Sequence, residues 1–214
     1  MYNALPMDWK VNNVGSTEFY YQNGESSENS IVYGTTPFGG SDLLWQCKPD
    51  ATSGADGGWN SRYFEIDRSK SYRYTIWIKK TGQLNNGSSY HGIQNVNNLD
   101  GTANVNPYFW ASKLPKIDTW YLIVGLVHPE GYTGSDTGIS GLYDMEGKKV
   151  ANGVEYKWGT ASQTRVRSYL YYCTDINTRQ YFWNPMFQVV DGSELRLDEL
   201  VRQKTLIKGK VTPK

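Results

Sequence analysis

The segment 72–79 constrains the fold more than any other part of the sequence, because tyrosine and isoleucine occupy every second position and mostly polar or charged residues occupy the positions between them. Two tyrosines and two isoleucines fall on one face of an extended chain, and Arg73, Thr75, Trp77 and Lys79 fall on the other. A period of two is typical of a β-strand with one face in a core and the other facing out. A tryptophan between two cations rarely faces water unless something binds to it. The segment therefore predicts a strand whose outer face contacts a ligand.

Strand-like segments recur along the rest of the chain, separated by glycine-rich turns. Residues 120–127 are apolar on both faces, which predicts a central strand in which Gly125 leaves a gap. Residues 165–173 alternate as 72–79 do. The 214 residues include 17 Tyr, 8 Trp and 22 Gly, and long helical patterns are missing. We therefore expect an all-β protein, a jelly-roll antiparallel β-sandwich with a short C-terminal helical segment, and a barrel is the alternative.

The sequence divides into three predicted segments. Residues 1–15 are irregular and are expected to be a lead-in or linker, and residues 16–192 are expected to form the sandwich. Residues 193–214 are expected to hold a helix at 195–206, capped by Ser193, and a basic tail. Cys47 and Cys173 fall in separate expected strands, which favours two buried thiols over a disulfide. The predicted core contains Tyr72, Tyr74, Ile76, Trp120, Leu122, Leu170 and Tyr172.

The charge balance limits the expected partners. The formal net charge is +1, so no bulk electrostatic attraction to nucleic acid or to an anionic membrane is expected. No apolar run reaches about 18 residues, so the sequence predicts no membrane insertion. The first residues lack a basic region followed by an apolar one, so no secretory signal is expected.

Aromatic and polar side chains on the outer strand faces suit a sugar. The apolar face of a pyranose lies flat on an aromatic ring, and its hydroxyls pair with guanidinium and amide groups. In the alternative interpretation, these rings form a second core layer, under a loop or against another subunit. Strand alternation predicts a platform of Trp77, Tyr121, Tyr169 and Tyr171 with Arg73 and Arg167 among the rings and Tyr90 and Trp110 at an edge.

Asp50, Asp56 and Glu65 are candidate ligands of a structural calcium ion, because calcium prefers carboxylate and carbonyl oxygens. Their spacing is not that of an EF-hand, and Asp and Gly are also ordinary loop residues. No other cofactor is expected. The two histidines and two cysteines show no zinc pattern, and no carboxylate pair for glycoside hydrolysis stands out in the sequence.

Several motifs taken together resemble known domains. They include Asn-Pro-Tyr-Phe-Trp at 106–110, Tyr-Leu-Tyr-Tyr-Cys at 169–173 and Gln-Tyr-Phe-Trp-Asn-Pro at 180–185, with further matching segments at 53–59, 72–79, 118–121, 127–132 and 190–194. The set resembles jelly-roll domains of bacteriophage tail-fibre and other virion appendage proteins, and more remotely it is similar to carbohydrate-binding modules. The motifs span roughly residues 30–200, and no sugar contact carries over residue by residue.

The resemblance implies a location and a function. It implies a module on the surface of a phage virion, assembled in the host cytoplasm, that binds host cell-surface polysaccharide without catalysis. Other virion proteins are the further expected partners, and a homotrimer is expected from the resemblance to fibres. Two alternatives stay open. One is an architectural virion subunit whose aromatic face is a protein interface, and the other is a polysaccharide depolymerase or lyase.

Overall fold

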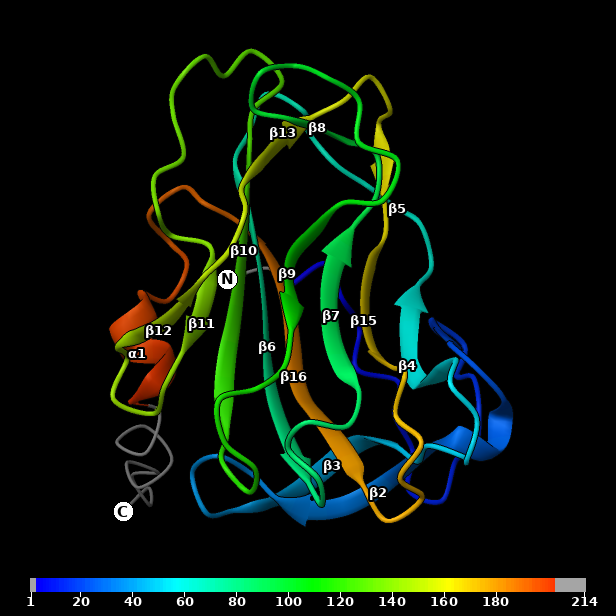
Figure 1. The fold of residues 1–214 in the computed structure, drawn as a ribbon. Helices are drawn as coiled ribbons and strands as arrows, with labels where there is room; N and C mark the ends of the chain where they lie inside the picture. The colour runs from blue at the N-terminus through cyan, green and yellow to red at the C-terminus, as the bar shows by residue number, and fades with distance from the viewer. Residues whose placement is uncertain (1–2, 203–214) are drawn as a thin grey trace, which may run out of the picture.

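Two β-sheets packed face to face make up the fold of residues 3–202, the part of the chain that this computed structural model describes (Figure 1). The first sheet has five strands in the order β1 (Tyr20–Gln22), β4 (Ala55–Ser61), β15 (Val166–Tyr171), β7 (Ser88–Ile93) and β9 (Tyr108–Ser112). The main path of the second, nine-stranded sheet is β12 (Lys149–Asn152), β11 (Gly141–Tyr143), β10 (Tyr121–His128), β6 (Tyr72–Thr81), β16 (Arg179–Val189), β3 (Ser41–Cys47) and β2 (Asn29–Thr35).

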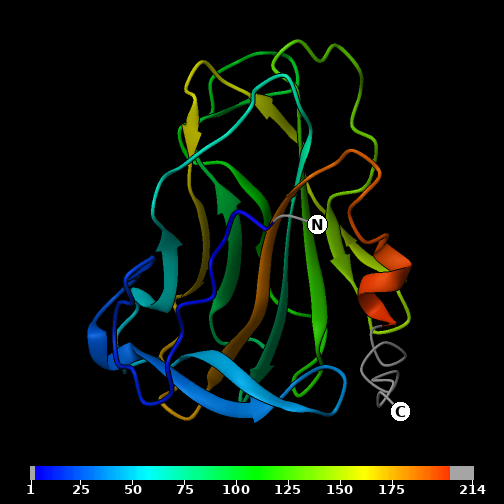
Figure 2. The ribbon, with the colours of Figure 1, turned by 180° about the vertical axis from the view of Figure 1, so that it is seen from behind.

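Short elements extend the second sheet and form a separate two-stranded sheet. β13 (Tyr156–Trp158) joins β10 in parallel and β8 (Val96–Asn98) antiparallel, and β5 (Phe64–Glu65) pairs with β14 (Gln163–Thr164). A 3-10 turn, η1 (Ser26–Glu28), precedes β2, and α1 (Leu197–Val201) follows β16. Seen from behind, β6 runs between β10 and β16 (Figure 2). The predicted all-β jelly-roll sandwich is confirmed.

The main core lies between the two sheets. Ile76 of β6 packs there with Trp59 of β4 and Leu170 of β15, and all three are fully buried. The central strand β10 is buried along its whole length. Gly125 of this strand leaves the predicted gap, because a Cβ at that position would lie 2.2 Å from the ring of Phe109. Phe109 of β9 fills that space.

The outer face of the nine-stranded sheet is buried as well. Trp77 of β6, Leu122 of β10 and Trp183 of β16 belong to a second hydrophobic cluster. Phe38 packs edge-on against both tryptophans, and Leu200 of α1, a helix beside β11 and β12 in Figure 1, also joins the cluster. Alternation therefore separates the two faces of β6 correctly, but the outer face is a second core layer. That is the alternative interpretation left open by the sequence.

The segment before β1 is part of the sandwich. Leu5 and Trp9 are buried in the main core. The Trp9 ring lies edge-on to Trp45, with ring centroids 5.9 Å apart. The expectation that residues 1–15 form a linker is wrong for the described part of that range, because its two largest apolar side chains complete the core.

The C-terminal helix is shorter than predicted. α1 covers Leu197–Val201, and Arg196 rather than Ser193 stands at its N-cap. The last part of the predicted helix and the basic tail fall in residues 203–214, which lie outside the described residues. Within residues 3–202 no helix has the length and apolar character needed to cross a membrane.

Large aromatic and sulfur-bearing side chains are mostly interior. All 8 tryptophans are buried, and Cys47 and Cys173 are buried free thiols, as expected. The predicted core residues are buried except Tyr172, which is 56% exposed. Strand β15 ends at Tyr171, and the left-handed backbone of Tyr172, with φ of 62°, reverses the alternation there.

Candidate functional site

A concavity on the outer face of the five-stranded sheet is lined almost wholly by aromatic and polar side chains. Its volume is about 430 Å³. We call this concavity the tyrosine groove, and its lining consists of Tyr90, Asn106, Tyr108, Arg167, Tyr169, Tyr171 and Tyr172. Four of the predicted glycan-binding residues lie in it, namely Tyr90, Arg167, Tyr169 and Tyr171.

The strand register brings these side chains together. Arg167 and Tyr169 are alternate residues of β15, so they share its outer face. Tyr169 lies opposite Tyr90 of β7, and Arg167 lies opposite Gly92. Gly92 in turn lies opposite Tyr108 of β9. Alternation in the sequence therefore places the β15 side chains of the groove correctly.

Arg167 is held in the groove by neutral partners. Its guanidinium lies 4.2 Å from the centroid of the Tyr108 ring, a cation–π contact. One Nη donates hydrogen bonds to Asn106 Oδ1 at 2.9 Å and to the Pro107 carbonyl oxygen at 3.1 Å, and Nε has no partner. Gly92 makes room for this arrangement, because a Cβ there would lie 3.0 Å from Arg167 Nε. The residue is 6% exposed, so its charge is largely shielded from water.

The tyrosine rings of the groove pack edge to face. The Tyr90 ring centroid lies 5.1 Å from that of Tyr108 and 5.5 Å from that of Tyr171, with interplanar angles of 63° and 74°. The Tyr169 hydroxyl donates to Asn60 Oδ1. Burial raises the pKa of Tyr169 to about 12, so this phenol is neutral at physiological pH. The groove thus offers fixed rings, neutral hydroxyls and one buried cation.

The other four predicted binding residues lie elsewhere. Trp77 belongs to the second hydrophobic cluster, and Arg73, on the same face of β6, is buried and donates to the Leu195 carbonyl oxygen. Tyr121 and Trp110 lie in the main core. The predicted single platform is wrong, because β6 and β10 belong to one sheet and β15 to the other. Outer-face residues of the two sheets point to opposite sides of the sandwich, and Tyr121 points into the core between them.

Sequence reasoning missed three groove residues. Asn106 and Tyr108 lie just before and at the start of β9. Because Phe109 faces the core, the alternation of side chains along a strand predicts that its neighbour Tyr108 lies on the outer face. Tyr172 was predicted to be in the core, and its exposure depends on a left-handed turn that the alternation pattern does not reveal.

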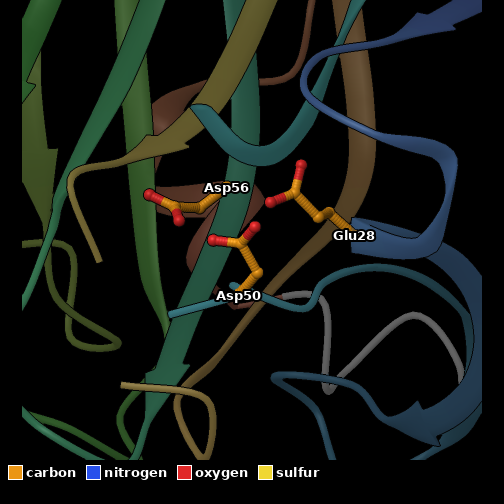
Figure 3. A group of neighbouring side chains, drawn as sticks. All are labelled: Glu28, Asp50 and Asp56. Carbon is orange, nitrogen blue, oxygen red and sulfur yellow. The ribbon is translucent and has the colours of Figure 1, made fainter. Parts of the chain in front are cut away.

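A group of three carboxylates lies near the start of β4, and none of them lines the groove. The group consists of Glu28 of η1, Asp50 in the loop before β4, and Asp56 of β4. Their carboxylate oxygens lie within 4.8 Å of one another (Figure 3). Asp56 is fully buried, and its Oδ1 has no hydrogen-bond partner. Its Oδ2 accepts the Cys173 N–H at 2.8 Å. Burial raises the pKa of Asp56 to about 7, so the buried negative charge is disfavoured without a compensating cation.

These three carboxylates fit a calcium ion. Calcium–oxygen distances of about 2.3–2.6 Å place ligand oxygens within roughly 5 Å of one another, and the unpartnered Asp56 oxygen supplies a free ligand. Asp50 and Asp56 were predicted from the sequence. Glu65 is not part of the group, because it lies in β5 and accepts a hydrogen bond from Gln163 instead. Glu28 takes the third position, and no local pattern in the sequence indicates that its turn approaches β4.

The fold is similar to that of several solved structures. No protein-family model and no curated protein matches the sequence. An exo-β-agarase superposes with a TM-score of 0.51 at 9% identity, over 97% of this chain and 31% of that chain. A CBM4 carbohydrate-binding module gives 0.45 at 11% identity, over 86% and 97%. Tailspike protein 4 of bacteriophage CBA120 gives 0.44 at 8% identity, over 84% and 22%. At such identities these likenesses concern the fold alone.

Proposed function

We propose that this chain is a non-catalytic module that binds a glycan in the tyrosine groove. The observation that carries the proposal is the lining of the groove, which combines five tyrosines with Asn106 and Arg167. Tyrosine rings present flat apolar faces to the C–H face of a sugar, and hydroxyl, amide and guanidinium groups match its hydroxyls. The rings are already packed against one another, so binding costs little side-chain entropy.

The lining favours binding over hydrolysis. Glycoside hydrolysis commonly uses two carboxylates that flank the scissile bond, whereas the groove is lined by tyrosine, asparagine and arginine. The depolymerase alternative therefore needs a site elsewhere on the molecule. The architectural alternative places the aromatic face, with Trp77 and Tyr171, in a subunit interface. Trp77 is buried within its own chain, whereas Tyr171 lines the groove.

A glycan array on the intact protein tests the proposal. One ring–sugar contact contributes about 1 kcal/mol, by analogy with aromatic pairs, so a single groove binds in roughly the micromolar-to-millimolar range, and many copies on one particle raise the avidity. Tyr171→Ala is expected to weaken binding about fivefold. Tyr33→Ala is the matched control, because Tyr33 is 65% exposed and lies outside the groove.

Three outcomes contradict this assignment. One is an array without any signal, and another is equal loss of binding in the Tyr171→Ala and Tyr33→Ala proteins. The third is the release of new reducing ends from a bound polysaccharide, abolished by a single carboxylate substitution, which would make the chain an enzyme.

We further propose that Glu28, Asp50 and Asp56 hold a structural calcium ion. The support is the unpartnered buried oxygen of Asp56 and the close approach of two further carboxylates. Such an ion would tie η1, the loop before β4 and β4 itself together. Its role would be to stabilise the fold, since none of the three carboxylates is among the residues that line the groove.

The virion location is a proposal that rests on the sequence resemblance to tail-fibre domains. In this view the module sits on the particle surface, contacts other virion proteins, forms a homotrimer and presents its grooves to host polysaccharide. Antibody labelling of purified particles tests the location, and light scattering of the purified protein tests the trimer. Particles that antibodies do not label would contradict the virion location, and a monomer in solution would contradict the trimer.

A further inference from the structure

The outer face of the five-stranded sheet carries three arginines, each stacked on a tyrosine. Arg62 lies over Tyr21 at 5.2 Å from the ring centroid, Arg165 lies over Tyr63 at 5.1 Å, and Arg167 lies over Tyr108 at 4.2 Å. We call these contacts the arginine–tyrosine stacks. Stacking fixes the plane of each guanidinium and leaves its edge free for hydrogen bonds.

The stacked arginines share one side of the sheet because of the strand register. Arg167 lies opposite Asn60 of β4, and Tyr21 of β1 also lies opposite Asn60. Arg165 and Arg62 are each two residues from this row, so alternation directs them to the same side. Two residues of a strand span about 7 Å, so Arg165 and Arg167 are separated along their strand by a distance of the order of one sugar unit, and the register that pairs Arg167 with Asn60 sets Arg62 opposite Arg165.

Among the residues that the structure describes, none of the three arginines has an acidic partner. Arg62 Nε donates to the Glu18 backbone carbonyl oxygen at 2.5 Å, and Arg165 Nε donates to Gln94 Oε1 at 2.9 Å. The partners of Arg167 are likewise neutral oxygens. Within residues 3–202 the ion pairs involve other cations and not these three. The face therefore holds three positive charges that no carboxylate of the described part of the chain pairs with.

The stacks extend the tyrosine groove along the sheet. Gln94, which binds Arg165 and also accepts from the Tyr63 hydroxyl at 2.6 Å, lines a second concavity with Pro107. Pro107 directly follows Asn106 of the tyrosine groove. A polymer lying in the groove can therefore continue past Asn106 toward Arg165 and Tyr63.

From this arrangement we propose that the glycan bound by this face is an acidic polysaccharide, whose oxyanion groups pair with Arg62, Arg165 and Arg167. The inference rests on the proposed glycan-binding function and names its ligand class. Guanidinium groups bind carboxylate and sulfate oxygens through paired, charge-assisted hydrogen bonds. The net charge of +1 gives no bulk attraction to any polyanion, so recognition of an acidic polymer must come from these three local guanidinium groups.

Paired probes separate the acidic group from the rest of the sugar. The intact protein is tested by affinity gel electrophoresis against alginate, polygalacturonate and hyaluronan, each beside its carboxyl-reduced form. Dextran sulfate beside dextran tests sulfate, and a single-stranded oligothymidylate tests nucleic acid. We expect at least one acidic polymer to bind about tenfold more tightly than its neutral counterpart. We also expect binding to weaken markedly between about 50 mM and about 300 mM salt, because exposed charges are screened.

Arginine variants identify the residues responsible. Arg62→Gln and Arg165→Gln are each expected to weaken binding of the acidic polymer about two- to fivefold, as for partly exposed pairs. Arg167→Gln is expected to weaken it about tenfold or more, because this guanidinium is buried. Arg179→Gln on the other sheet removes the same charge and is the control. If Arg167→Gln fails to fold, the Arg62→Gln/Arg165→Gln double variant decides the question.

The outcomes separate the two proposals. Equal binding of acidic and carboxyl-reduced or unsulfated polymers, unchanged in the arginine variants, overturns the acidic ligand and leaves glycan binding in place. Tighter binding of the oligothymidylate than of every polysaccharide overturns the acidic glycan in favour of nucleic acid. Binding of no polysaccharide, acidic or neutral, overturns the proposed function and this inference together.

Discussion

Replacing Trp77 by alanine distinguishes a buried second layer from an exposed binding face. Trp77 is 1% exposed, and Phe38 packs edge-on against it with ring centroids 5.4 Å apart. Truncating a buried tryptophan to alanine costs about 3–5 kcal/mol of unfolding free energy, because apolar contacts are lost and a cavity remains. For a domain of this size each kcal/mol lowers Tm by about 2–4 °C. We therefore expect Trp77→Ala to melt about 6–20 °C below the parent protein.

The same variant is expected to keep its glycan binding at temperatures where it is folded, because Trp77 and the tyrosine groove lie on different sheets. Calorimetry gives Tm, and the glycan array gives binding. Tyr33→Ala is the control, since this exposed ring contributes less than about 0.5 kcal/mol. A Trp77→Ala protein that melts within about 2 °C of the parent and no longer binds glycan would refute the reasoning. It would restore Trp77 as an exposed contact residue.

Three further predictions concern the calcium group and the core. Calcium at about a hundred times its Kd is expected to stabilise the protein by about 2.7 kcal/mol, and melting with calcium or with a chelator should show this gain in the parent but not in Asp56→Asn. The pKa of Asp56 is raised from 3.8 to about 7, so without calcium its contribution to stability is present below pH 3.8 and is lost as pH rises through 7. Calcium requires the ionised carboxylate, and the calcium-dependent rise in Tm should therefore be larger near pH 8 than near pH 5; a rise that shrinks with pH would count against the site. Gly125→Ala places a methyl group 2.2 Å from the Phe109 ring and should destabilise the fold by about 1–3 kcal/mol, and an unchanged denaturation midpoint would show that this gap is not filled.

Strand alternation predicted which side chains share a face but not what covers that face. On β6 it separated Tyr74 from Trp77 correctly, and the two lie in different clusters. The outer cluster exists because α1 and Phe38 fold over the sheet, and no local pattern encodes such a long-range contact. The same alternation placed Arg167 and Tyr169 correctly, because nothing within residues 3–202 closes the groove that they line.

Contacts between distant segments account for the remaining errors. Glu28 lies beside Asp50 and Asp56 in space although it is distant in sequence. The predicted third ligand was Glu65, because it is the carboxylate that follows the Asp50–Asp56 loop in the sequence. Tyr121 and Trp77 were assigned to one platform with the β15 tyrosines, but sheet membership depends on strand order, which a list of strands does not contain. The amino-acid composition and the two-residue alternation of side chains predicted the fold class. They did not predict which residues from distant segments make up each site.

The burial of all 8 tryptophans has a consequence for optical measurements. An indole shielded from water emits fluorescence at shorter wavelength than an exposed one, so the emission maximum should move to longer wavelength when the protein unfolds. The groove is lined by tyrosines and by no tryptophan, so a ligand in it touches no indole directly. Tryptophan emission is therefore suited to following unfolding, whereas ligand titrations call for tyrosine absorbance or a label placed near Tyr172.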